Sequence, residues 1–174
     1  MARGSVRGAL VTGCALLALV VGAGPACAGP GPGGRHPSGA ARVGPVSDLR
    51  VMRVDPGAAT PGGTTTVHAY VANEGPDRTA SAFTVLVTLP PGSWAEGPFF
   101  PQSCRVSYDG RHVRCEFPAG LPPLRSATAL IPVRIAADVA APGLLTGGQV
   151  TALGPDDPDH TDNRQPFDIP VAQP

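Results

Sequence analysis

Four carboxylates lie within seven residues near the C-terminus, which is the densest group of chemically capable side chains in the sequence. They are Asp156, Asp157, Asp159 and Asp162, and Asn163 follows them. Hard oxygen ligands in a loop can hold Ca²⁺, so Asp157, Asp159, Asp162 and Asn163 form a candidate calcium set. Asp and Asn are also favoured in turns, because their side chains hydrogen-bond to nearby backbone. The spacing does not match an EF-hand loop, so we expect a turn, with calcium as the alternative.

Nucleophilic or transition-metal catalysis finds no support in the other residues. The histidines, His36, His68, His112 and His160, share no metal-ligand spacing. No G-x-S-x-G segment is present to form a nucleophile elbow, and aspartates in a turn do not by themselves indicate a catalytic carboxylate pair. We therefore expect no enzymatic activity, no catalytic residue, no transition-metal site and no cofactor.

Three of the chain's eight aromatic residues, Trp94, Phe99 and Phe100, lie in one Pro/Gly-rich connection. We expect this loop to fold over the open end of the domain and plug its core. The alternative is that the Trp94–Phe100 loop is exposed and binds a small apolar or carbohydrate ligand.

Cys104 and Cys115 flank the dipeptide Asp109-Gly110, which is a strong hairpin signal. A two-residue type I′ turn needs positive φ at both central positions, and Asp-Gly favours it. A hairpin centred there pairs residue 108 with 111, 106 with 113, and 104 with 115. Directly opposed Cα atoms lie about 4.5–5.5 Å apart, within disulfide range. We expect a structural disulfide between Cys104 and Cys115, with two buried free thiols as the alternative.

The N-terminus has the pattern of a secretory signal peptide, residues 1–28. Arg3 and Arg7 precede an apolar stretch that ends at the small-residue site Ala26-Cys27-Ala28. The apolar run is too short and interrupted for a membrane span. Residues 29–47 are rich in Gly and Pro and are expected to form a flexible tether. We expect a secreted, extracellular protein with no stable membrane span; a lipoprotein anchored at Cys27 is the alternative.

From Asp48 to Ala172 the sequence predicts short antiparallel strands. Apolar residues alternate with polar ones in runs that Gly, Pro, Asp and Asn separate. We expect a first strand that begins at residue 49. Further strands are expected over about 66–71, 83–89, 131–135, 150–152 and 167–171, in addition to the hairpin at 104–115. Pro132 and Pro170 cannot donate to a ladder, so they must face an edge or a bulge. About seven or eight strands in one domain, 48–172, indicate an all-β, immunoglobulin-like antiparallel sandwich.

Four motifs mark the turns of this region: Asn73-Glu74-Gly75-Pro76, Leu89-Pro90-Pro91-Gly92, the cysteine pair about Gly110, and Asp157-Pro158-Asp159 with Asp162-Asn163. They resemble the turn motifs of the bacterial Ig-like "conserved repeat" domains of exported and surface proteins of actinobacteria. Leu124 stands where that family commonly has Gly. All 13 basic residues are Arg, which is typical of a GC-rich genome such as an actinobacterial one. The resemblance implies an extracellular structural or adhesive module whose biochemical role is mostly unknown.

These observations lead to a functional expectation without a named partner. The zero net charge argues against nucleic acid, because its binders need a basic surface. We expect a monomeric, non-enzymatic structural or protein-interaction module with a protein or cell-surface partner. Loops or an exposed edge strand would make the contact.

Overall fold

The computed structural model describes residues 44–174. The predicted signal peptide, the alternative anchor at Cys27 and most of the predicted tether lie outside the described residues. Within the described part, Val46 N–H donates to Asp77 Oδ2 (3.0 Å), and Ser47 N–H donates to Asp156 O (3.1 Å). Contacts with the folded domain therefore begin two residues before the predicted boundary at Asp48.

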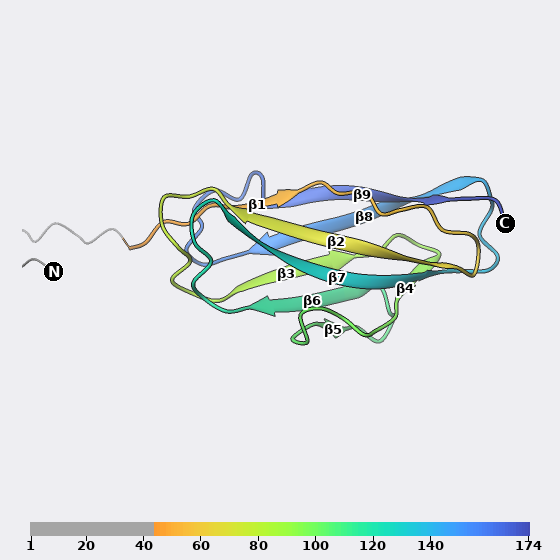
Figure 1. The fold of residues 1–174 in the computed structure, drawn as a ribbon, viewed down its shortest axis with the longest axis horizontal. Coiled ribbons are helices and arrows are strands. Elements are labelled where there is room, and N and C mark those ends of the chain that lie inside the picture. Colours follow the sequence, from red (N-terminus) through yellow and green to blue (C-terminus); the bar gives the residue numbers. More distant parts are fainter. Residues whose placement is uncertain (1–43) are drawn as a thin grey trace, which may run out of the picture. The chain divides into compact units, whose positions relative to one another are not determined.

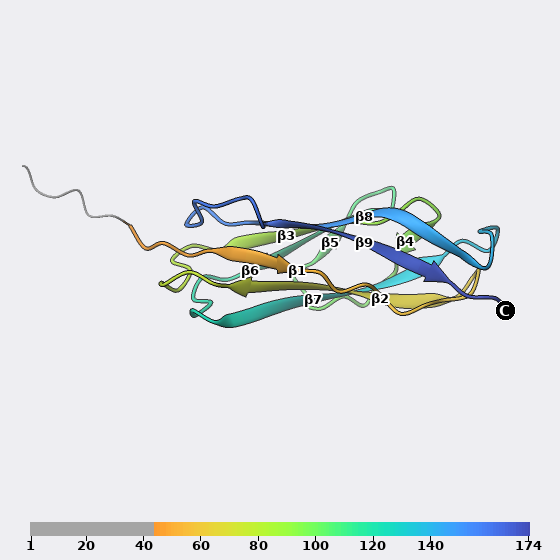
Figure 2. The same cartoon turned by 90° about the horizontal axis from the view of Figure 1, so that it is seen from above.

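Nine strands and no helix make up the described residues, and they form two antiparallel sheets. Figure 1 shows the strands, and Figure 2 shows the two layers, with β3, β8 and β9 facing β2 and β7. One sheet has the order β1 (Leu49–Met52), β2 (Thr64–Asn73), β7 (Arg125–Ile135), β4 (Ser93–Ala95). The other has the order β5 (Arg105–Val106), β6 (His112–Phe117), β3 (Phe83–Thr88), β8 (Gly143–Leu153), β9 (Arg164–Val171).

The predicted immunoglobulin-like sandwich is confirmed. Strands β1, β2 and β7 are neighbours in one sheet and β3, β8 and β9 in the other, which corresponds to the A-B-E and C-F-G groups of that fold. The alternation seen in the sequence decides which side chains face inward. Val67, Ala69 and Val71 from β2 are buried against residues such as Val85 and Ile169 of the opposite sheet. Burial of this apolar layer is the main stabilising contribution to the fold.

The two prolines lie where a missing N–H does least harm. Leu130 N–H points to the β4 side of β7, where it donates to Phe100 O (2.7 Å). Pro132, two residues on, points the same way, into the gap between β4 and Phe100. Pro170 lies on the edge strand β9. The prediction that both prolines face an edge or a bulge therefore holds for Pro170. Pro132 instead lies on the internal strand β7, where its carbonyl accepts from Glu96 N–H (2.9 Å) just beyond β4.

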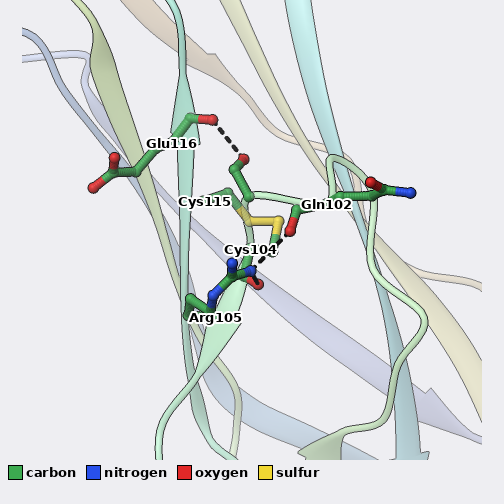
Figure 3. The surroundings of a disulfide bond; sticks show 6 residues. Gln102, Cys104, Arg105, Cys115 and Glu116 are labelled. Carbon is green, nitrogen blue, oxygen red and sulfur yellow. Dashed lines mark hydrogen bonds between the residues drawn. A yellow bond between two sulfur atoms is a disulfide. The ribbon is translucent and has the colours of Figure 1, made fainter.

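The hairpin prediction is confirmed in register but wrong in turn type. Arg105 pairs with Arg114 and Val106 with Val113, and Cys104 and Cys115 form the disulfide with Cα atoms 3.9 Å apart. Both sulfurs are buried, and Arg105 donates to the carbonyl oxygens of Gln102 and Cys104 (both 2.8 Å; Figure 3).

The turn itself is a four-residue loop, because Ser107 N–H donates to His112 O (2.8 Å) and Gly110 N–H donates to Ser107 O (3.0 Å). Gly110 has a positive φ of 71°, whereas Asp109 does not. The Asp109 carboxylate instead accepts hydrogen bonds from Arg111 N–H (3.0 Å) and from the Ser107 hydroxyl. These local bonds favour an Asx-type turn over the type I′ turn.

The turn motif Asn73-Glu74-Gly75-Pro76 after β2 requires Asn at its first position and Gly at its third. The Asn73 side chain is fully buried, and its Oδ1 accepts from Asp48 N–H (3.2 Å) and Gly75 N–H (3.1 Å). Its Nδ2 donates to the carbonyls of Asp77 (2.8 Å) and Leu121 (2.9 Å). A Cβ on Gly75 would lie 2.6 Å from Asp48 N, so only glycine fits there.

Candidate functional site

The aromatic segment divides between the core and the surface. Phe99 packs against the core, as a plug would. Trp94 lies on β4 opposite Arg134, and Phe100 pairs with Leu130, so both rings point to the outer face of the four-stranded sheet. They are 39% and 56% exposed. The segment predicted to be an irregular loop therefore contains a short strand, because residues 93–95 extend the sheet beside β7.

Three further nonpolar side chains lie on the same outer face, at its other end. Met52 and Tyr70 are cross-strand partners on β1 and β2, and Leu124 precedes β7. Leu124 is 85% exposed and adopts a left-handed conformation with φ of 57°. These three residues line a shallow hollow of about 270 Å³. We call Met52, Tyr70, Trp94, Phe100 and Leu124 the aromatic face.

Leu124 combines exposure with an unfavourable backbone conformation. Glycine, which tolerates a positive φ, would fit this position without strain. A leucine there costs about 1–2 kcal/mol relative to an ordinary backbone conformation. The chain thus keeps a strained, exposed nonpolar side chain, and such outliers tend to mark functional surfaces.

Polar groups at the borders of the aromatic face are paired with one another. Arg134 Nε donates to Glu96 Oε2 (2.6 Å) at one end, and Arg50 pairs with Glu74 (3.2 Å) at the other. The Ser126 hydroxyl donates to Tyr70 Oη (2.6 Å). These pairs satisfy their polar groups internally. The exposed His68, opposite Leu130 on β7, adds an imidazole to the same outer face.

The hairpin tip holds Trp94 in place. Ala95 N–H donates to Gly110 O (2.8 Å), and a Cβ on Gly110 would lie 3.0 Å from the Trp94 Cβ. A side chain at residue 110 would therefore push against Trp94. The disulfide-linked hairpin and the aromatic face are one structural unit.

Two of the four strand edges in the described part, those of β9 and β1, are largely blocked for a partner strand. On β9, Asp168 N–H donates to Asp55 Oδ1 (3.4 Å) and Ala172 N–H, just beyond the strand, to Ala59 O (3.0 Å). Pro166 and Pro170 share this outward parity and have no N–H. On β1 the outward N–H groups bond to the loop 156–163. This protection disfavours edge-strand addition at β9 and β1.

The acidic loop closes the seam between the two sheets. Asp157 is buried, and its carboxylate accepts from Leu49 N–H (3.0 Å), Asp159 N–H (3.0 Å) and Asn163 Nδ2 (2.8 Å). Asp159 accepts two hydrogen bonds from Thr161, at 2.9 and 2.7 Å. The loop therefore has the turn role that Asp and Asn favour. It holds all four candidate calcium residues, but no three carboxylates of the described part are arranged to hold one metal ion.

Electrostatics in the described residues follow local hydrogen bonds and do not converge on one cleft. The Ser107 hydroxyl and Arg111 N–H lower the pKa of Asp109 to about 2. Burial, followed by the charge of Asp162, raises the pKa of Asp48. Between residues 44 and 174 no group of three or more His, Cys, Asp or Glu side chains is arranged to hold a metal ion.

The sequence pattern identified Trp94 and Phe100 but missed Met52, Tyr70 and Leu124. Met52 and Tyr70 occupy outward positions of alternating strands, where polar residues are usual. An apolar or aromatic residue on the expected polar side of a strand was the available signal. Which of these residues become neighbours on one face depends on the order of the strands in the sheet, and that order could not be predicted from the sequence.

No protein-family model matches this chain, and no curated protein matches it. The part of the chain that the structure describes contains no helix that could span a membrane.

Among solved structures, the chain is similar to a crystal structure of BcpA*(D312A), the major pilin subunit of Bacillus cereus. The TM-score is 0.49 at 9% identity, and the match covers 74% of this chain but only 39% of the pilin. It is also similar to a cohesin module of a Clostridium perfringens family 33 glycoside hydrolase (TM-score 0.43, 14% identity, 75% and 99% covered). AvmM, which catalyses macrocyclization in alchivemycin A biosynthesis, gives a TM-score of 0.39 at 11% identity, with 74% and 89% covered. Similarity at this level says nothing about what the chain binds.

Proposed function

We propose that this chain is a secreted, non-enzymatic protein-interaction module that binds a protein partner through its aromatic face. One observation carries the proposal: five large side chains from β1, β2, β4 and the flanking loops lie exposed along the outer face of one sheet. Exposed aromatic rings on a rigid sheet supply large contact area at low entropic cost, and such residues dominate interface energetics.

Two further observations support a location outside the cytoplasm and a role without chemistry. The Cys104–Cys115 disulfide is typical of oxidising compartments. The perturbed carboxyl groups Asp109 and Asp48 lie in a turn and at the seam, and they do not converge on one cleft. We also propose that the chain is related to the actinobacterial "conserved repeat" domains, because the structural or adhesive role that this resemblance implies agrees with an interaction module.

A carrier that binds a small apolar or carbohydrate ligand through the Trp94–Phe100 loop is less well supported. The hollow on this face lies at Met52, Tyr70 and Leu124, at the other end from Trp94. A carrier predicts a change in Trp94 fluorescence on titration with soluble oligosaccharides, whereas the interaction module predicts none.

The test compares two serine variants with the same native exposure. Phe100 and Leu144 are both 56% exposed, but Leu144 lies on β8 of the other sheet. Labelled protein is added to intact cells of the organism that produces it, and the bound fraction is measured. We expect Phe100→Ser to weaken binding about 30-fold, as loss of an aromatic anchor does, and Leu144→Ser to bind like the wild type. Equal binding by both variants would overturn the proposal.

A further inference from the structure

Buried oxygens without hydrogen-bond partners are concentrated at one place in the domain. Five such side-chain atoms occur among residues 44–174, and four of them lie on two short segments. The four are Ser47 Oγ, Asp48 Oδ1, Asp162 Oδ1 and Asn163 Oδ1. An unpartnered buried polar atom is costly, and a carboxylate oxygen more so, so a cluster of them calls for a missing partner.

The two segments are joined side by side at the seam. Val51 N–H donates to Asp162 O and Ser47 N–H to Asp156 O (both 3.1 Å). Ser47 is fully buried and Asn163 is 3% exposed. The Asn163 Nδ2 donates to Asp157 Oδ2 (2.8 Å), which fixes the amide inside the loop and leaves its Oδ1 as the free acceptor.

Negative charge surrounds this seam and is only partly balanced. Burial raises the pKa of both Asp48 and Asp162, and Asp157, Asp159 and Glu74 add to the negative charge near Asp48. Arg50 is the one cation that acts on Asp162 in the opposite direction. No N–H or O–H in the described residues satisfies the four oxygens, so a cation is the partner that fits their charge.

The chemistry of the donor set selects the kind of cation. All four atoms are hard oxygens, from two carboxylates, one amide and one hydroxyl, which suits Ca²⁺. Asp157 is a poor ligand, because donors already occupy both of its oxygens. The exposed Asp159 is held within the loop's own turn by the two bonds that Thr161 donates to its Oδ1. We propose that Asp48, Asp162 and the amide oxygen of Asn163 bind a calcium ion that fastens the loop 156–163 to β1. With two carboxylates and water completing the coordination, the site belongs with weak extracellular calcium sites, with dissociation constants of about 10⁻⁴–10⁻³ M.

Thermal unfolding of the full chain with and without CaCl₂ tests the site. At about 10 mM Ca²⁺ we expect the midpoint to rise by about 3–8 °C, and EDTA to reverse the rise. Asp48→Asn and Asp162→Asn should each abolish most of this increment. Without calcium, both variants should unfold at or above the wild-type temperature, because each removes a poorly compensated buried charge.

Two control variants make the outcome specific. Asp138→Asn changes an exposed aspartate far from the seam in sequence and should keep the full increment. Asp159→Asn should also keep it, whereas the calcium set suggested by the sequence predicts its loss. The proposal is overturned if calcium leaves the wild-type midpoint unchanged, or if Asp48→Asn and Asp162→Asn respond to calcium like Asp138→Asn. Neither result bears on the aromatic face.

Discussion

Phe100 and Leu130 exchange two backbone hydrogen bonds. Phe100 N–H donates to Leu130 O (3.1 Å), and Leu130 N–H donates to Phe100 O (2.7 Å). This pair attaches the connection after β4 to the central strand β7. It directs Phe99 to the core and Phe100 to solvent, because neighbouring side chains on an extended segment point to opposite sides. The exposure of Phe100 is therefore fixed by backbone pairing.

The contact between Gly110 and Trp94 gives a stability prediction. Gly110→Ala forces a side chain into positive φ and against Trp94, so it should lower the free energy of unfolding by about 1–3 kcal/mol. Gly120 also has positive φ, but a Cβ there meets nothing within 4 Å. Gly120→Ala should therefore cost less, and urea unfolding measures both. Equal losses would mean that the contact with Trp94 contributes nothing.

Asn73→Ala should be among the most destabilising polar substitutions. It removes four hydrogen bonds from a fully buried site and leaves Asp48 N–H and the Asp77 carbonyl without their partner. We expect a loss of about 2–4 kcal/mol. Glu74→Ala, which removes only an exposed ion pair, should change stability by less than about 1 kcal/mol. Similar losses from both would contradict the role assigned to Asn73.

Leu124→Gly should separate stability from function. Glycine relieves the left-handed strain, so the free energy of unfolding should rise by about 0.5–1 kcal/mol. The same change removes an exposed nonpolar contact, so partner binding should weaken. A variant that binds as well as the wild type would remove Leu124 from the aromatic face as a functional surface.

The hairpin should resist acid until very low pH. The pKa of Asp109 is lowered to about 2 by the Ser107 hydroxyl and Arg111 N–H. A lowered pKa means that the charged form contributes stability above the unfolded value, near 3.9, and that this is lost as pH falls through about 2. An NMR titration should give Asp109 a midpoint near 2 and a higher midpoint in Ser107→Ala. An unchanged midpoint in the variant would contradict the assigned cause.

Loss of the disulfide gives a prediction about the hairpin as a whole. The double change Cys104→Ser with Cys115→Ser opens a short loop and should cost about 2–3 kcal/mol. Because Gly110 O accepts from Ala95 N–H, the loss should also alter Trp94 fluorescence before global unfolding in urea. A single transition with unchanged native fluorescence would show that the hairpin does not support Trp94.

Local sequence patterns were sufficient for the strands, the sandwich and the cysteine pairing, since alternation and turn residues act within a few positions. They failed where a side-chain hydrogen bond or a longer-range contact decides. The Asp109 side chain selects its own turn, and β4 exists only because β7 lies beside it. The aromatic face likewise joins residues 52, 70, 94, 100 and 124, which only the sheet order brings onto one surface. Asp48 reaches the acidic loop across the seam for the same reason.

Trp94 allows the most direct test of the interaction surface, because it is the only tryptophan in the chain and lies on the aromatic face. Acrylamide quenching of its fluorescence is measured for the free protein and for protein bound to intact cells. The proposed function predicts ready quenching in the free protein and marked protection with a blue-shifted emission in the bound state. Bound protein whose Trp94 is quenched as readily as in solution would contradict it.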